Sequence, residues 1–103
     1  MSLTGPFPIR LKQASIRKGL TQQQLGVMLG LDPNNASARM NQYERGKHAP
    51  DFATVNRIAE LLGVPAAWFY CEDDLEASII EAVHQLTDEQ KHALLTFIKQ
   101  LQG

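Results

Sequence analysis

Hydrophobic residues recur along this 103-residue chain at the three- and four-residue spacing of helices, and no segment shows the alternation expected of a strand. The pattern predicts a first helix over residues 8–18, with Pro8 in its first turn. A second helix begins after Thr21, which forms a capping box with Gln24, and ends at Gly30. The chain is therefore predicted to be helical from its first elements onward.

A third helix is predicted to begin with Asp32 as its N-cap and Pro33 in its first position. Ala36, Met40 and Tyr43 follow at spacings of four and three residues. These three side chains lie on one side of a helix, so they are predicted to face the core.

Two further helices complete this part of the chain. The fourth runs from its cap, Asp51, to Gly63, and a short fifth runs from Pro65 to about Tyr70. The fifth carries aromatic residues that are predicted to belong to the core rather than to a ligand site.

The composition shifts at residues 71–74, so the predicted domains are residues 1–70 and residues 71–103. The second domain has two amphipathic helices, the latter beginning with a capping box formed by Thr87 and Gln90. Their apolar stripes consist of Leu75, Ile79, Val83 and Leu86, and of Leu94, Ile98 and Leu101. Such a hairpin has two possible arrangements: it folds back onto residues 1–70, or it pairs with its copy in a second chain.

The net charge of −1 averages two unlike halves of the chain. Residues 1–50 carry seven basic and two acidic residues, a net charge of +5, whereas residues 51–103 carry three basic and nine acidic residues, a net charge of −6. The asymmetry suggests that the first half meets a polyanion. Chance segregation of charges onto solvated faces is the alternative interpretation.

The outward face of the third predicted helix is made of short, amide or guanidinium side chains. They are Asn34, Ser37, Ala38, Asn41, Gln42 and Arg45, with Arg39 on the flank. Asparagine and glutamine can pair with adenine through two hydrogen bonds, arginine pairs similarly with guanine, and serine bonds several base edges. Small residues also allow a helix to lie deep in the major groove. The face is thus predicted to read DNA, although an ordinary solvated surface has the same residue types.

Three segments resemble the Cro/repressor-like, or XRE-type, helix-turn-helix regulators. They are GLTQQQLG at 19–26, YERGKHAPD at 43–51 and RIAELLGVPAAWFY at 57–70, and the resemblance covers roughly residues 7–70. It implies an all-α fold, in which a five-helix lambda-repressor-like DNA-binding domain precedes the C-terminal two-helix hairpin. It also implies that a recognition helix, about residues 33–45, enters the major groove.

The family motif gives candidate DNA contacts by position. The base-contacting candidates are Ser37, Ala38, Arg39, Asn41 and Gln42, of which Arg39 and Asn41 come from helical phase rather than from the family. The backbone-contacting candidates are Gln22, Arg45 and Lys47.

The chain has four more residues between Gly30 and Glu44 than the family usually has. Because four residues are close to one helical turn of 3.6 residues, we interpret them as an added turn at the start of the third helix. Asn34 and Asn35 would then approach the DNA, whereas a loop would remove them from it.

A second departure concerns Glu44. The family commonly pairs this glutamate with an arginine, but Ser15 stands at the arginine's position. Glu44 is therefore expected to find another partner, either Arg39 or Arg17, or to remain solvated.

Nothing in the sequence indicates catalysis, a metal or a cofactor. Cys71 lies beside three acidic residues, which raise a thiol pKa and disfavour a nucleophile. His48, His84 and His92 share no metal-binding spacing. No glycine-rich phosphate loop or hydrolase motif occurs, and no small-molecule ligand is evident.

The sequence therefore predicts a transcriptional regulator rather than an enzyme, with double-stranded DNA as its partner. A homodimer on a two-fold operator is favoured, because a single helix-turn-helix unit reads only a few base pairs. The alternative is a protein-interaction module of the same fold, such as an antitoxin or adaptor. No apolar run approaches the roughly 20 residues of a membrane span, no signal peptide is seen, and one cysteine fits a reducing interior, so a cytoplasmic location is expected.

Overall fold

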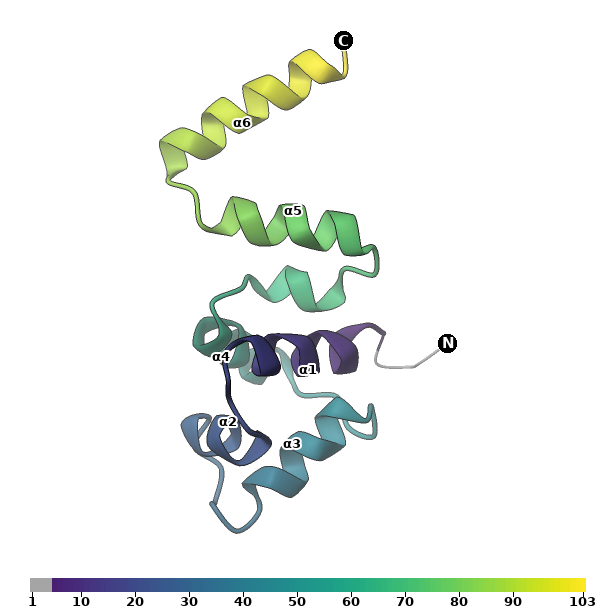
Figure 1. The fold of residues 1–103 in the computed structure, drawn as a ribbon, viewed down its shortest axis with the longest axis vertical. Helices are drawn as coiled ribbons and strands as arrows, with labels where there is room; N and C mark the ends of the chain where they lie inside the picture. Colours follow the sequence, from purple (N-terminus) through teal and green to yellow (C-terminus); the bar gives the residue numbers. More distant parts are fainter. Residues whose placement is uncertain (1–4) are drawn as a thin grey trace.

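The computed structural model describes residues 5–103, and within that range the chain consists of helices joined by short turns (Figure 1). The elements are α1 (Phe7–Arg17), α2 (Gln22–Met28), α3 (Ala36–Glu44), α4 (Phe52–Leu62), the 3-10 helix η1 (Ala66–Tyr70), α5 (Asp74–His84) and α6 (Asp88–Leu101). The predicted all-α class is confirmed, with a 3-10 helix as the fifth element of the first part.

Local capping explains where most of these helices begin. The capping boxes predicted at the starts of α2 and α6 both form, with the two reciprocal hydrogen bonds present in each. Asp51 caps α4 as predicted and accepts a hydrogen bond of 2.8 Å from the Thr54 backbone amide. Hydrogen bonds from the side chain and backbone of Thr54 lower the pKa of Asp51.

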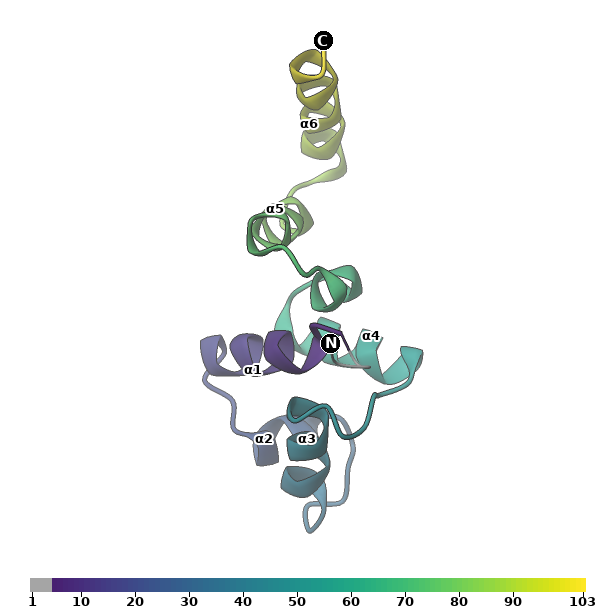
Figure 2. The same cartoon turned by 90° about the vertical axis from the view of Figure 1, so that its right-hand side faces the viewer.

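The core lies where α1, α4 and η1 meet, and α2 and α3 close one end of it (Figure 2). The largest fully buried side chains are Phe7, Leu11, Leu25, Met40, Val55, Ile58 and Phe69. The predicted inward stripe of α3 is confirmed, since Ala36, Met40 and Tyr43 are all buried. One face of α3 is therefore committed to packing and the other is not.

The predicted start of the third helix is wrong. Helix α3 begins at Ala36 with Asn35 as its cap, so the helix predicted over residues 33–45 covers only residues 36–44. Asp32 instead closes a separate turn: its carboxylate accepts from the Asn34 amide at 2.8 Å and its carbonyl accepts from the Asn35 amide at 2.8 Å. The four extra residues thus lengthen the connection between α2 and α3 rather than the helix.

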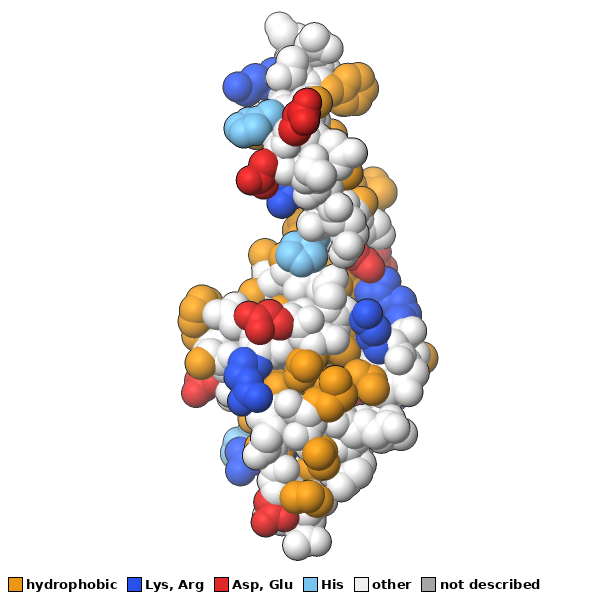
Figure 3. Space-filling view, turned by 90° about the vertical axis from the view of Figure 1, so that its left-hand side faces the viewer, with side chains coloured by type: hydrophobic (Ala, Val, Ile, Leu, Met, Phe, Trp, Pro, Cys, Tyr) orange, Lys and Arg blue, Asp and Glu red, His pale blue; other side chains and the backbone are white. Residues whose placement is uncertain are grey.

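The last two helices form an arm that projects from the other end of the molecule, which measures 54 × 30 × 22 Å (Figures 1 and 2). No residue of α6 is buried. Figure 3 shows hydrophobic side chains along one edge of this arm and charged and histidine side chains along the other. Two arrangements were considered for the hairpin. The one in which it folds back onto residues 1–70 is seen in part for α5 and is not seen for α6.

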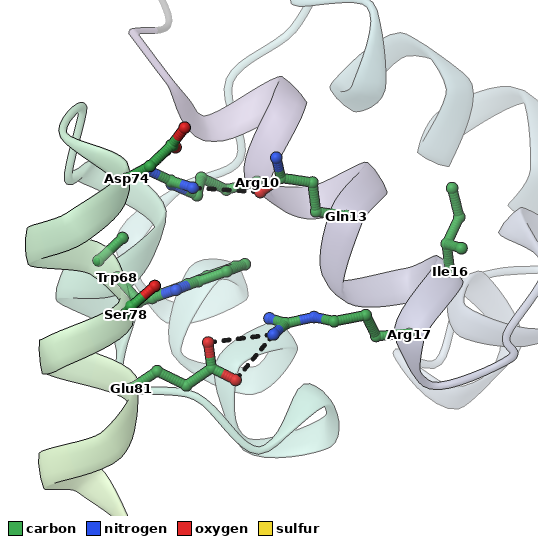
Figure 4. Close-up of a pocket in the computed structure, with 9 residues that line it drawn as sticks. Arg10, Gln13, Ile16, Arg17, Trp68, Asp74, Ser78 and Glu81 are labelled. Atoms are coloured by element: carbon green, nitrogen blue, oxygen red, sulfur yellow. Dashed lines mark hydrogen bonds and ion pairs between the residues drawn. The ribbon is translucent and has the colours of Figure 1, made fainter.

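Helix α5 is joined to α1 by two arginines that flank Trp68 (Figure 4). Arg10 is only 6% exposed and donates to the Cys71 carbonyl from Nε at 3.1 Å and from Nη2 at 2.8 Å. Arg17 binds both carboxylate oxygens of Glu81, at 3.1 and 2.9 Å. The side chains of Arg10, Arg17 and Glu81 line a cleft of about 440 Å³ between α1 and α5.

These contacts also revise the charge argument. Arg10, paired with Asp74 at 3.1 Å, and Arg17, paired with Glu81, belong to the basic half of the chain but bind acidic residues of the other half. Part of the charge asymmetry therefore holds the arm in place and does not serve a polyanion.

Candidate nucleic-acid interface

Helices α2 and α3 approach each other closely because Gly26 lies between them. A Cβ atom at Gly26 would lie 2.7 Å from the Ala36 Cβ and 3.0 Å from the Ala36 carbonyl oxygen. The absence of a side chain at Gly26 thus fixes how the first turn of α3 sits against α2. Gly26 belongs to the segment GLTQQQLG, but nothing in that segment reveals its contact with Ala36, which lies ten residues later.

Replacing Gly26 with alanine should reduce the free energy of unfolding by about 1–3 kcal/mol, because the added methyl group overpacks this contact. Urea denaturation followed by circular dichroism measures the change. Val27→Ala, at an exposed position of the same helix, is the matched control and should change stability far less. Equal stability of Gly26→Ala and the wild type would show that α3 can shift without cost.

The outward face of α3 carries the predicted base-contacting residues on the surface. Ser37, Ala38, Arg39 and Asn41 are exposed and Gln42 is half-buried. Their helix has only nine residues, and its opposite face is the buried stripe described above. The structure therefore brings all five candidates to the end of the molecule that is remote from α6 (Figure 1).

Gln22, predicted to contact a phosphate, is engaged with α3 in this structure. Its Nε2 donates to Glu44 Oε2 at 2.6 Å and to Asn41 Oδ1 at 3.2 Å, and its Oε1 accepts from Ser37 Oγ at 3.4 Å. This network, formed by Gln22, Ser37, Asn41 and Glu44, joins the start of α2 to the exposed side of α3. It orients two base-contacting candidates, while Gln42 stands outside it.

The expected partners of Glu44 are therefore wrong. The Gln22 amide binds this carboxylate, and Arg17 is engaged by Glu81 instead. Ser15, at the position of the family's arginine, satisfies its own hydroxyl, which donates to the Leu11 carbonyl at 2.8 Å. Glutamine at the start of α2 thus substitutes for the arginine of the family pattern.

The turn after α3 holds the remaining basic candidates. Gly46 has φ of 70°, a conformation that suits glycine, and lets the chain reverse so that the Lys47 amide donates to the Gln42 carbonyl at 2.9 Å. Arg45 and Lys47 are both exposed. Two cations therefore lie at the C-terminal end of α3, where a groove-bound helix would leave them near the DNA backbone.

Asn34 and Asn35 are exposed, but they belong to the turn before α3 and not to its outward face. The Gln23 side chain fixes this turn by donating to the Pro33 carbonyl at 2.9 Å. The alternative in which these residues form a loop is therefore the one observed, and neither asparagine joins the base-contacting candidates.

Other chemistries find little support in the part of the chain that the structure describes. Residues 5–103 contain no group of three or more His, Cys, Asp or Glu side chains placed to hold a metal ion. Over the same residues, none of the helices has the length and apolar character needed to cross a membrane.

Comparison with known proteins agrees with this geometry. The helix-turn-helix family model HTH_3 matches residues 11–69. The "cryptic phage CTXphi transcriptional repressor RstR" of Vibrio cholerae is 24% identical over 100 residues, which cover 92% of this chain and 86% of that protein. The crystal structure of the transcriptional regulator BswR superposes with a TM-score of 0.84 at 48% identity, covering 90% of this chain and 92% of that one.

Proposed function

The chain belongs to the XRE-type helix-turn-helix family, and from that premise we propose that it represses transcription by binding an operator as a homodimer, with α3 in the major groove. At the coarser level it is a DNA-binding transcriptional regulator. The observation that carries the finer proposal is the exposed face of α3, which is rich in hydrogen-bonding groups directly opposite a fully buried stripe. A buried stripe fixes the helix, and the free face is left to read base edges.

The proposed contacts fall into two groups. Ser37, Ala38, Arg39, Asn41 and Gln42 would meet base edges, which carry sequence information. Gln22, Arg45 and Lys47 would meet phosphates and set the register of α3 on the duplex. For Gln22 this means that its amide exchanges a contact with Glu44 or Asn41 for a phosphate oxygen.

We further propose the division into a DNA-binding domain, residues 1–70, and a dimerisation element, residues 71–103. The arm lies at the end of the molecule remote from α3, and its surface has exposed apolar side chains on α5 and α6. A dimer would place two recognition helices on half-sites about one helical turn, roughly 34 Å, apart. The proposed site of action is the cytoplasm.

A protein-interaction module of the same fold is the competing function. The exposed apolar arm favours this function only if the protein that packs against the arm is not a second copy of this chain. A module of that kind would not need α3 to read bases, so DNA sequence specificity separates the two functions.

Selection of bound sites from a random DNA pool tests the proposal most directly. We expect a two-fold sequence motif with half-site centres about 10 base pairs apart. A motif without symmetry would contradict the dimer but not the DNA contact. No enrichment at all, from protein that is folded by circular dichroism, would contradict the regulatory function.

Lys47→Ala should weaken binding to all DNA sequences and reduce the slope of log K against log salt by about one unit, because one phosphate contact is lost. Fluorescence anisotropy across a salt series measures the slope. Arg57→Ala is the charge-matched control, since Arg57 is exposed on α4 and is not among the proposed contacts. A slope that does not change for Lys47→Ala would remove Lys47 from the phosphate contacts.

A further inference from the structure

We propose that the cleft between α1 and α5 binds a free amino acid with an apolar side chain, and that this ligand is an effector of the regulator. The effector role rests on the function proposed above, whereas the binding site does not. The cleft, of about 440 Å³, lies within the range of roughly 300–1,000 Å³ that small-molecule sites occupy. Its lining combines an exposed ion pair, hydrogen-bond donors without acceptors and an apolar wall.

The two ends of the cleft differ (Figure 4). At one end Arg10 is 6% exposed and is committed to the Cys71 carbonyl and to Asp74. At the other end the side chains of Arg17 and Glu81 are 51% and 33% exposed. An ion pair as exposed as this one contributes little stability, so it can open at little cost. The Arg17 end is therefore where a ligand can enter.

Two side chains at the cleft have donors to offer. Arg17 binds both Glu81 oxygens through Nη1, so its Nε and Nη2 have no acceptor within residues 5–103. The indole N–H of Trp68, a residue that is only 2% exposed, also forms no hydrogen bond in that range. Since no fully buried side-chain nitrogen there lacks a partner, this N–H must reach solvent, and Trp68 lines this cleft. A carboxylate suits such donors, above all the two free nitrogens of an arginine.

Charge narrows the ligand further. The charged side chains that line the cleft are two arginines and two carboxylates, Asp74 and Glu81, so the cleft is neutral. A plain carboxylate on Arg17 would compete with Glu81 and leave that charge without a partner, which is unfavourable. A free amino acid has a carboxylate for Arg17 and an ammonium group for Glu81 on the same carbon. It can therefore bridge the pair and keep every charge matched.

The remaining wall of the cleft is apolar. Ile16, Ala77 and the ring of Trp68 line it. Ile16 is 67% exposed, so much of its apolar surface lies in water. A ligand side chain that covers this surface would gain the free energy of removing it from water. The wall thus favours an amino acid with an apolar side chain over a polar one.

Trp68 is the single tryptophan of the chain, so selectively excited tryptophan fluorescence reports from this cleft alone. Titration with L-phenylalanine and with L-leucine through the millimolar range should change the emission, and calorimetry should give the same dissociation constants. 3-Phenylpropionate lacks the ammonium group and phenethylamine lacks the carboxylate. Each should bind about 5- to 30-fold more weakly than L-phenylalanine, because one charged contact is lost.

Two variants locate the contacts. Glu81→Gln should weaken L-phenylalanine about 5- to 30-fold and leave 3-phenylpropionate bound at least as tightly, because the competing carboxylate is gone. Arg17→Gln should weaken both probes. Lys12→Gln is the matched control, since it removes an exposed positive charge of α1 that does not line the cleft, and it should change neither affinity.

Each outcome is decisive for the site. No change of fluorescence and no heat with either amino acid, from protein that is folded by circular dichroism, would overturn it. Equal affinities for L-phenylalanine and 3-phenylpropionate would overturn the contact with the ammonium group. Binding that neither Arg17→Gln nor Glu81→Gln weakens would show that the ligand lies elsewhere.

The effector role has its own readout. A ligand held by Arg17 and Glu81 ties α1 to α5 and restricts the arm, so part of the ordering cost of operator binding is already met. Saturating L-phenylalanine should therefore raise the operator affinity of the wild type about 5-fold or more, and that of Glu81→Gln much less. An unchanged affinity would overturn the effector role and leave the site intact. A protein that binds no DNA would contradict the proposed function, and the titration of Trp68 would still decide the site.

Discussion

Replacing Ile98 with aspartate should lower the affinity for a two-fold operator by about 100-fold or more, with little change in binding to non-specific DNA. A carboxylate in the proposed seam would have to be buried without a partner, which strongly disfavours association. Each separated subunit still reaches a half-site, but it loses the effective concentration, in the mM range, that links two binding events. Sedimentation and operator titration of the same protein measure both effects.

The structure makes this prediction sharper than the sequence alone does. Because no residue of α6 is buried, the substitution should leave the thermal unfolding of residues 5–86 unchanged. Thr96→Asp is the matched control, since it introduces the same charge on the other side of α6 and should leave the dimer intact. If Ile98→Asp unfolds the whole protein, the arm is part of one core and the dimer proposal loses its basis.

The elements that the sequence predicted well are those fixed by neighbouring residues. The capping boxes starting at Thr21 and Thr87 need only a glutamine three residues later and a backbone amide, so their spacing determines the bonds. The buried stripe of α3 follows similarly from helical periodicity. Local chemistry therefore located most helix starts and the free face of α3.

The start of α3 shows where local chemistry is ambiguous. An aspartate followed by proline can cap a helix, but the same carboxylate can close a turn on Asn34, as it does here. Contacts from α2 decide between the two: Gln23 holds the Pro33 carbonyl, and Gly26 lets Ala36 pack at the true start of the helix. Neither contact is visible in the spacing of residues 30–36.

The polar contacts of the site depend on pairs that are remote in sequence. Gln22 and Glu44 are 22 residues apart, and Arg17 and Glu81 are 64 apart. The family pattern indicated that Glu44 needs a donor, but only the packing of α2 on α3 identifies the Gln22 amide as that donor. The sequence thus predicted which side chains lie on the free face of α3 and not how they bind one another.

Gln42→Ala should cost about 1–3 kcal/mol on the preferred operator and relax the preference at one base position, because it removes a two-bond contact to a base edge. Gln42 suits this test better than Ser37 or Asn41, since their loss would also disturb the network around Gln22. Binding is measured by anisotropy on the preferred site and on its single-base variants.

Asn34→Ala is the matched control for Gln42→Ala, because it removes an exposed amide from the turn before α3, where no base contact is expected. Its affinity for every site should remain that of the wild type. An equal loss on all DNA sequences for Gln42→Ala would show that this amide contacts the backbone, since phosphate contacts carry no sequence information. A loss confined to sites with one particular base pair places Gln42 opposite that base, and because α3 is fixed by its buried stripe, that single assignment orients the helix in the groove.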